Sequence, residues 1–523
     1  MSSRLWAFGF LLSVHGLLEL PIHNQVRDIG TGHKSLQRDA ESNLKRQSLS
    51  ETTFFSQPWS VGGNFYINIT VGTPRQDQSV RLSTGNADSY FASPNAELCR
   101  SGRCRGGTYQ RTASSTCTVV EASPGFNLTS QDGSVTSGPF VKDNIGIGGV
   151  FVEGVQFAIA EERISAIPVD TGVLGLGYNA TEAVTTAIYS NFPDMMVSSG
   201  LSASKLFSMF LGARDTLGSI LFGGIDASKY TGELQTLDLI PAAWPYTLRD
   251  GSSSTAIRDY RTAITQAESK SGGETTKLWA GGSDGIAAYT RSDASVPVAL
   301  SSTAENLFLP SEYYDRYIIP NFPFLLGNTT CSCDYANTDM RLWLTFGGKA
   351  RISLETSKLL SPYIDTKTGE PLAYQNGTAM CILSIIRDEP KGQYAYLVGH
   401  AALSSMYVVF DQDNNQVSIA QAATNPPSES QIIEVEAGPG GVAKAIASAS
   451  ASSLPSNSPS ISTPASTPTP GSTSNTGAIA GGVVGGVAGL ALIGAAVFLI
   501  VPRRKSRPMK VAGMRQYEVD QRS

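Results

Sequence analysis

The stretch FYINITVGTP, residues 65–74, alternates apolar and polar side chains and then reaches a glycine and a proline. Alternation with a period of two is typical of a β-strand with one buried face, and Gly and Pro end such strands. Outward from this stretch, residues 51–438 continue as short apolar runs interrupted by Gly, Asn, Asp and Pro, with little helical periodicity. We therefore predict an all-β body made of two similar halves.

The composition excludes several classes of protein. The chain has 523 residues, of which 41% are hydrophobic, so it can bury a large core, and its net charge of −5 argues against a nucleic-acid partner. Of its four histidines only His400 lies beyond residue 47. One histidine leaves little room for a His-based metal site or a Ser-His-Asp triad. We predict neither a metal nor a cofactor.

The N-terminus carries the features of a secretory protein. Arg4 precedes a short apolar run at 5–18, which has the length and flank of a signal-peptide core. We assign residues 1–22 to the signal peptide. The polar segment 23–46 ends in a Lys-Arg pair, which is either a kexin-type processing site that makes the segment a propeptide, or a solvated pair of charges.

The C-terminal part changes composition twice. Residues 439–476 are almost all Ser, Thr, Pro, Ala and Gly, and such a segment buries too little apolar area to offset its ordering entropy. We predict an extended, O-glycosylated stalk here. Residues 477–501 are uncharged and mostly apolar. At ~1.5 Å per residue they cover the ~30 Å hydrocarbon core of a bilayer, which predicts one transmembrane helix.

The residues after this helix predict its orientation. Segment 502–523 begins with a cluster of Arg and Lys, which favours the cytoplasmic side. A GPI signal would end in its hydrophobic tail, whereas this chain continues with polar residues. We predict a single-pass type I protein of the plasma membrane or cell surface, with its ectodomain outside. Glycines at 481, 485 and 489 suggest a helix-mediated dimer, although chance explains them as well.

Five N-x-S/T motifs lie in the body, and the cytoplasmic tail has none. This distribution agrees with the predicted topology and makes these asparagines candidates for N-glycosylation: Asn68, Asn127, Asn179, Asn328 and Asn376.

The order of motifs in the body resembles the pepsin-type aspartic proteases. The matching segments are YINITVGTP (66–74), DGS (132–134), GVLGLGY (172–178), GSILFGGID (218–226), TFGG (345–348) and YVVFD (407–411). The resemblance runs from about residue 60 to 438. It implies a bilobal double barrel with a central cleft, an N-terminal lobe at 60–240 and a C-terminal lobe at 241–438.

Both catalytic loops of that family are altered here. Where the family has Asp-Thr-Gly, this chain has Ser83, Thr84 and Gly85. Where it has Asp-Ser-Gly before a Leu-Pro, this chain has Ser301, Ser302 and Thr303. The resemblance therefore implies that serine replaces both catalytic aspartates.

Serine cannot perform the chemistry of the missing aspartates. The family uses two carboxylates that share one proton, one activating water and the other polarising the scissile carbonyl. A serine hydroxyl is neither an effective base near neutral pH nor an acid. The resemblance also places a flap tyrosine two residues before the Asp-Gly-Ser motif, where this chain has Ser130. We therefore predict no catalytic residues.

Other residues are weaker candidates for a working site. Asp170 belongs to a literal Asp-Thr-Gly, but this triplet lies directly before Val-Leu-Gly-Leu-Gly, at a place where the family has an unrelated loop. Asp88 matches a structural aspartate of the family, and Glu305 reads as a solvated loop residue. Ser83 or Ser301 would need a base to act as a nucleophile, and His400 reads as structural.

The six cysteines are compatible with disulfides in an oxidising compartment. The resemblance pairs Cys99 with Cys104, and Cys381 with either Cys331 or Cys333. Cys117 has no assigned partner.

We interpret the chain as an aspartic-protease-like cell-surface glycoprotein, a pseudoprotease whose cleft binds a peptide or protein. The first alternative is an active aspartic-type endopeptidase with a non-standard site. The second is a structural surface glycoprotein whose cleft holds no ligand.

Overall fold

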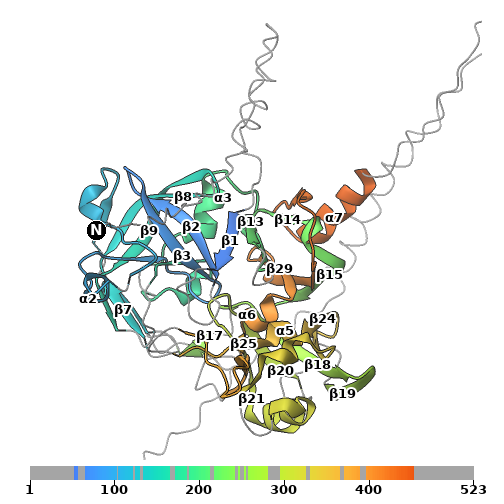
Figure 1. Ribbon diagram of the computed structural model, residues 1–523. Helices are drawn as coiled ribbons and strands as arrows, with labels where there is room; N and C mark the ends of the chain where they lie inside the picture. Colours follow the sequence, from blue (N-terminus) through green and yellow to red (C-terminus); the bar gives the residue numbers. More distant parts are fainter. Residues whose placement is uncertain are drawn as a thin grey trace, which may run out of the picture. The chain divides into compact units, whose positions relative to one another are not determined.

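The computed structural model describes residues 52–452 (Figure 1), with the exception of 57–64, 103, 122–123, 130–133, 165–170, 185–187, 213–216, 242–245, 248–252, 255–256, 281–294, 326–329, 366–369 and 389–395. The predicted signal peptide and propeptide lie outside the described residues. So do the stalk from residue 453 onward, the membrane segment 477–501 and the tail 502–523. Among the helices that the structure describes, none is long and apolar enough to cross a membrane.

Strands dominate the described chain, so the prediction of an all-β body is confirmed. The larger sheet has 13 strands in the spatial order β15 (Tyr230–Asp238), β30 (Gln416–Ala422), β29 (Met406–Asp411), β12 (Leu206–Phe210), β13 (Gly218–Phe222), β1 (Thr52–Ser56), β2 (Phe65–Val71), β3 (Gln76–Ser83), β11 (Val173–Gly175), β4 (Tyr90–Ala92), β9 (Val150–Ala160), β8 (Phe140–Ile147) and β5 (Thr118–Val120). Strand β2 also pairs with β8, so the part of the sheet from β2 to β8 closes into a barrel.

A second sheet belongs to the later half of the chain. Its order is β24 (Ala350–Glu355), β23 (Arg341–Phe346), β18 (Arg261–Ser271), β20 (Val296–Leu300), β28 (Tyr396–Val398), β21 (Leu307–Pro310) and β27 (Ile385–Asp388), with β19 (Glu274–Ala280) paired to β18. Smaller sheets contain β10 (Glu162–Ile164), β7 (Val135–Gly138) and β6 (Phe126–Thr129); β22 (Thr330–Ser332), β26 (Met380–Leu383) and β25 (Leu360–Pro362); β14 (Gly224–Asp226) and β31 (Ile432–Glu434); and β16 (Tyr246–Thr247) and β17 (Ser253–Ser254).

The alternation in FYINITV is visible in strand β2. Ile67, Ile69 and Val71 are buried, whereas Asn68 is exposed and Thr70 is half-buried. The apolar face of β2 joins a core cluster that continues through both large sheets. The pattern therefore marks a sheet with one solvated face, as predicted.

The two halves are not separate along the chain. Strands β29 and β30, at residues 406–422, pair with β12 and β15 of the first half. Phe207 on β12 stacks on Phe410 of β29, with ring centroids 4.8 Å apart. The boundary predicted at 240/241 therefore lies between β15 and β18, but a late segment of the chain returns to the first sheet.

Helices are short, except for one at the end of the described chain. They are α2 (Glu97–Arg100), α3 (Phe192–Ser198), α4 (Ser311–Tyr313), α5 (Thr356–Leu359), α6 (His400–Leu403) and α7 (Gly441–Ser452). Helix α7 occupies a part of the chain that the sequence predicts as extended stalk. Val442 is buried, and Ala445 and Ile446 pack beside it against the cluster around Ile225 and Val435. The spacing i, i+3, i+4 puts these small apolar side chains on one helix face.

Candidate functional site

The two predicted catalytic loops begin at the ends of equivalent strands. In the first half, β3 ends at Ser83 and runs parallel to β11, with Leu82 opposite Leu174. In the second half, β20 ends at Leu300 and runs parallel to β28, with Leu300 opposite Val398. In each half, one strand pairs with both strands that flank the loop: β11 pairs with β3 and β4, and β28 pairs with β20 and β21. Such a frame fixes the loop backbone from both sides.

The loops are joined by hydrogen bonds that form a symmetric set. The Thr84 amide donates to Ser302 Oγ at 3.0 Å, and the Ser302 amide donates to Thr84 Oγ1 at 3.0 Å. The same hydroxyls donate onward across the halves, Thr84 Oγ1 to the Leu300 carbonyl at 2.7 Å and Ser302 Oγ to the Leu82 carbonyl at 2.6 Å. All four bonds are buried, so both loops are held in one arrangement.

Ser83 and Ser301 directly precede the two residues that make these bonds. Ser83 is buried and its Oγ accepts from the Asn86 amide at 3.1 Å. Ser301 is also buried, and its Oγ lies 3.4 Å from Thr303 Oγ1. Among the described residues, neither serine hydroxyl contacts an imidazole, carboxylate or amine. Neither has a base that would activate it as a nucleophile.

His400 supports the second loop from behind. Its Nε2 lies 2.6 Å from the Ser302 carbonyl, and its ring packs edge-on against Phe65. A carbonyl can only accept, so Nε2 donates and Nδ1 is the unprotonated nitrogen, which has no partner. Burial lowers the pKa of His400 to about 4, and the nearby Arg81 acts in the same direction. The histidine is therefore neutral above about pH 4 and hydrogen-bonds to the backbone of the second loop.

The carboxylates near the first loop accept hydrogen bonds from residues outside that loop. Asp88 accepts from the Tyr189 hydroxyl and from the Ala183 amide, both at 2.7 Å. Burial nevertheless raises the pKa of Asp88. Neighbouring Glu182 is buried too, and desolvation raises its pKa to about 8. No pattern in the sequence marks Glu182, because the burial of a loop carboxylate depends on tertiary contacts.

Of the remaining candidates, Glu305 lies in the second loop, between β20 and β21, and the others lie outside the described residues. Glu305 is half-buried. Burial raises the pKa of Tyr66 to about 12, and the negative charge of Glu305 acts in the same direction. Asp170 and Ser130 both lie outside the described residues, and Ser130 follows β6 directly in the sequence; β6 and β7 pair as a hairpin. That hairpin is the predicted flap, and its described strands pair in register, with Thr129 opposite Val135.

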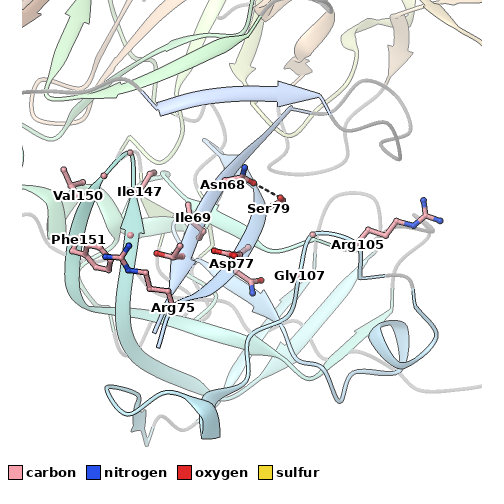
Figure 2. Close-up of a pocket in the computed structure, with 16 residues that line it drawn as sticks. Asn68, Ile69, Arg75, Asp77, Ser79, Arg105, Gly107, Ile147, Val150 and Phe151 are labelled. Carbon is pink, nitrogen blue, oxygen red and sulfur yellow. Dashed lines mark hydrogen bonds between the residues drawn. The ribbon is translucent and has the colours of Figure 1, made fainter. Parts of the chain in front are cut away.

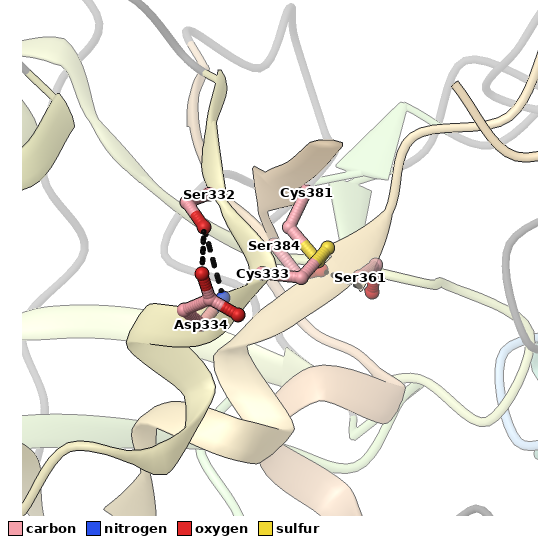
Figure 3. Close-up of a disulfide and its surroundings, with 6 residues drawn as sticks. All are labelled: Ser332, Cys333, Asp334, Ser361, Cys381 and Ser384. Carbon is pink, nitrogen blue, oxygen red and sulfur yellow. Dashed lines mark hydrogen bonds between the residues drawn. A yellow bond between two sulfur atoms is a disulfide. The ribbon is translucent and has the colours of Figure 1, made fainter. Parts of the chain in front are cut away.

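Two disulfides are present in the structure. The expected Cys99–Cys104 bridge is formed, and Cys333 rather than Cys331 pairs with Cys381. Figure 3 shows the second bridge beside Ser332, whose hydroxyl contacts Asp334 at 3.0 Å. Cys331 on β22 is a buried free thiol and lies opposite Cys381 on β26. Cys117 is a free, half-buried thiol.

The glycosylation candidates differ in their surroundings. Asn68, Asn127 and Asn376 are exposed. In contrast, Asn179 is half-buried, and its side-chain nitrogen, which would carry a sugar, donates one of its two N–H groups to Asp194 at 2.8 Å. Asn328 lies outside the described residues. Within the described chain, no cluster of three or more His, Cys, Asp or Glu is arranged to hold a metal ion.

The fold and the paired loops define a class of protein, and comparison with known proteins agrees. The sequence profile of the family described as "Eukaryotic aspartyl protease" matches residues 64–422. This chain belongs to that family, and its body has the mostly-β, barrel-containing fold of the pepsin type.

Fungal proteins are among its relatives. The "Probable aspartic-type endopeptidase OPSB" of Arthroderma benhamiae is 30% identical over 392 residues, which cover 73% of each chain. The "Aspartic proteinase yapsin-3" of Saccharomyces cerevisiae is 28% identical over 386 residues, 69% of this chain and 66% of the relative. The "Secreted aspartic protease 7" of Candida albicans is 28% identical over 371 residues, 68% of this chain and 60% of the relative.

Proposed function

We propose that this protein is a catalytically inactive member of the aspartyl protease family that binds a polypeptide segment in the cleft in front of its two loops. One observation carries the proposal. Thr84 and Ser302 keep the loops bonded to each other, while their neighbours Ser83 and Ser301 provide no carboxylate. The framework that positions a substrate is retained without the acid and base that cleave it.

The surroundings of the serines argue against a replacement mechanism. A serine nucleophile needs a base within hydrogen-bonding reach, and His400 instead points Nε2 at the Ser302 carbonyl. The buried carboxylate closest in sequence to the first loop, Asp88, is committed to Tyr189 and Ala183. These contacts support binding, rather than hydrolysis, as the function of the site.

We further propose that the protein acts at the cell surface as an anchored glycoprotein with its ectodomain outside. The apolar segment 477–501, the basic residues that follow it and the exposed sequons support this placement. Alkaline carbonate extraction should leave the full chain in the membrane pellet. A chain that ends at residue 476 should be soluble, and recovery of the full chain in the supernatant would refute the anchor.

Peptide binding is tested by titrating the full-length protein in detergent with a library of labelled decapeptides. We expect saturable binding of a subset of sequences. Gly85 offers a variant that fills the space in front of the first loop, since no atom lies within 4 Å of a Cβ built there. Gly85→Phe should weaken binding by about tenfold or more.

A matched control is Lys277→Phe, which adds the same ring at an exposed position on β19. It should bind peptides as the unmodified protein does. No saturable binding to any peptide would contradict the proposal and leave a structural surface glycoprotein. Equal binding by Gly85→Phe would show that peptides bind elsewhere.

A further inference from the structure

A hollow lies beside strands of the first barrel (Figure 2). It has a volume of about 830 Å³ and is lined by β2, β3, the segment 105–107 and the turn between β8 and β9. No residue of the two loops lines it. The hollow therefore does not belong to the site described above.

The wall of this hollow contains a complete glycosylation motif. Asn68 and Thr70 both line it, because alternate residues of a strand share a face. The Asn68 side chain is exposed, and its Oδ1 accepts from Ser79 Oγ at 2.8 Å. This hydrogen bond holds the oxygen of the amide in place. Among the described residues, the amide nitrogen Nδ2, which would carry the sugar, has no hydrogen-bond partner.

The lining suits a neutral, polar ligand with some apolar surface. The Phe151 side chain is 39% exposed, and the Arg75 guanidinium lies 4.2 Å from its ring centroid. Asp77 stands on the neighbouring strand, and Arg105 lies at the far edge in Figure 2. These charges of both signs, together with the Phe151 ring at one edge, do not select an anion. They offer donors and acceptors for hydroxyl groups and a flat surface for sugar C–H groups.

The turn beside Phe151 also leaves room for a bulky group. Gly149 has a φ of +86°, and no atom lies within 4 Å of a Cβ built on it. The space beside this glycine is therefore open.

We propose that the N-linked glycan of Asn68 folds back into this hollow and packs on Phe151, so that the hollow is a cradle for the protein's own carbohydrate. The attachment point lies in the wall, so the first sugars are held there at high effective concentration. Weak contacts then suffice for occupancy. This inference rests on the secretory route in the proposed function, because only that route supplies the glycan.

The test compares two glycans on one molecule. The full-length protein is made in a host that adds high-mannose glycans. It is kept native and treated with an endoglycosidase. Glycopeptide mass spectrometry then measures the trimming at each site over time. Asn376 is the internal reference, because it is exposed in a turn where its Oδ1 accepts from the Thr378 amide at 3.0 Å. We expect the Asn68 glycan to be trimmed about tenfold more slowly than that of Asn376. After denaturation the two rates should be equal.

Phe151→Ala separates packing in the hollow from simple crowding by the strands. It should bring the native trimming rate at Asn68 close to that at Asn376. Val119→Ala removes another exposed apolar side chain, 59% exposed on β5, and should change neither rate.

Three results would overturn the inference: an unmodified Asn68 beside a glycosylated Asn376, equal native trimming rates, or protection that survives Phe151→Ala. In each of these the glycan on Asn376 still reports secretion, so the secretory route would stand. A chain without any glycan would refute both.

Discussion

At the residue scale, neighbouring positions in each loop have different roles. Thr84 and Ser302 join the two halves, whereas the hydroxyls of the residues before them, Ser83 and Ser301, hydrogen-bond within their own loops. Serine in a loop of this kind preserves the backbone arrangement while removing the groups that exchange protons. The side chains at positions 83 and 301 can therefore change without loss of the hydrogen bonds that join the two loops.

Restoring the aspartates should not restore a full enzyme. We predict that the double variant Ser83→Asp, Ser301→Asp cleaves peptides at least ~10²-fold more slowly than an active relative, because Ser130 and Thr303 also depart from the family's working site. Peptide cleavage at pH 3 to 7 measures this. The isosteric Ser83→Asn, Ser301→Asn variant is the control, and robust cleavage by the aspartate variant alone would contradict the prediction.

The cysteines give a second test at this scale. Cys331 stands directly opposite Cys381, which is bonded to Cys333. We predict that Cys333→Ser still forms a disulfide, now between Cys331 and Cys381, because facing strand positions bring the two Cβ atoms within reach. Non-reducing peptide mapping measures the pairing. In contrast, Cys381→Ser should leave no disulfide at this sheet, and finding a free Cys381 in Cys333→Ser would refute the prediction.

At the scale of elements, the sequence predicted the strands better than their connections. FYINITV has the period of a half-buried strand, and β2 forms where expected. Cys331 and Cys333 lie two residues apart, so no pattern of the chain decides which of them bonds. Helix α7 was missed because its Ala- and Ser-rich sequence is compatible with an extended stalk. Its burial depends on contacts with β14 and β31.

The bonds between the loops should dominate local stability. Thr84→Val removes one hydroxyl that serves two buried bonds, leaving the Leu300 carbonyl and the Ser302 amide without that partner. We predict a loss of about 2–4 kcal/mol in the free energy of unfolding, by urea denaturation. Ser83→Ala removes only the acceptor of the Asn86 amide and should cost about 1 kcal/mol or less. Equal losses would contradict the structural role of Thr84.

At the scale of the whole molecule, two buried groups give stability opposite dependences on pH. The pKa of His400 falls from 6.5 to about 4 on folding, so its contribution is complete above pH 6.5 and is lost as pH falls toward 4. The size of that loss is roughly 3 kcal/mol. The pKa of Glu182 rises from 4.5 to about 8, so its contribution is present below pH 4.5 and is lost as pH rises toward 8.

Single variants should expose each dependence. Glu182→Gln is predicted to leave a protein that becomes more stable as pH rises from 4 to 6.5. His400→Gln, which retains an N–H donor for the Ser302 carbonyl, is predicted to leave one that becomes less stable from pH 4.5 to 8. Denaturation midpoints across this range measure both. Profiles that match the unmodified protein would show that these groups do not titrate as described.

The paired loops could be located from the sequence because their flanking motifs keep the order of the family. The buried residues that support these loops could not be located from the sequence. His400 is a single residue in a segment without a distinctive pattern, and only the fold directs its Nε2 to the Ser302 carbonyl. Glu182 likewise becomes buried through contacts made far from it in sequence. Sequence therefore locates the two loops, and three-dimensional packing explains what holds them.

The most direct test of the central claim is a cleavage assay on the full-length protein in detergent. The protein is incubated with a diverse peptide mixture from pH 3 to 7, with and without an inhibitor of pepsin-type enzymes, and products are read by mass spectrometry. The account predicts no cleavage at any pH. Inhibitor-sensitive cleavage would contradict it, and would mean that a carboxylate such as Asp170 or Glu305 reaches the site occupied by Ser83 and Ser301.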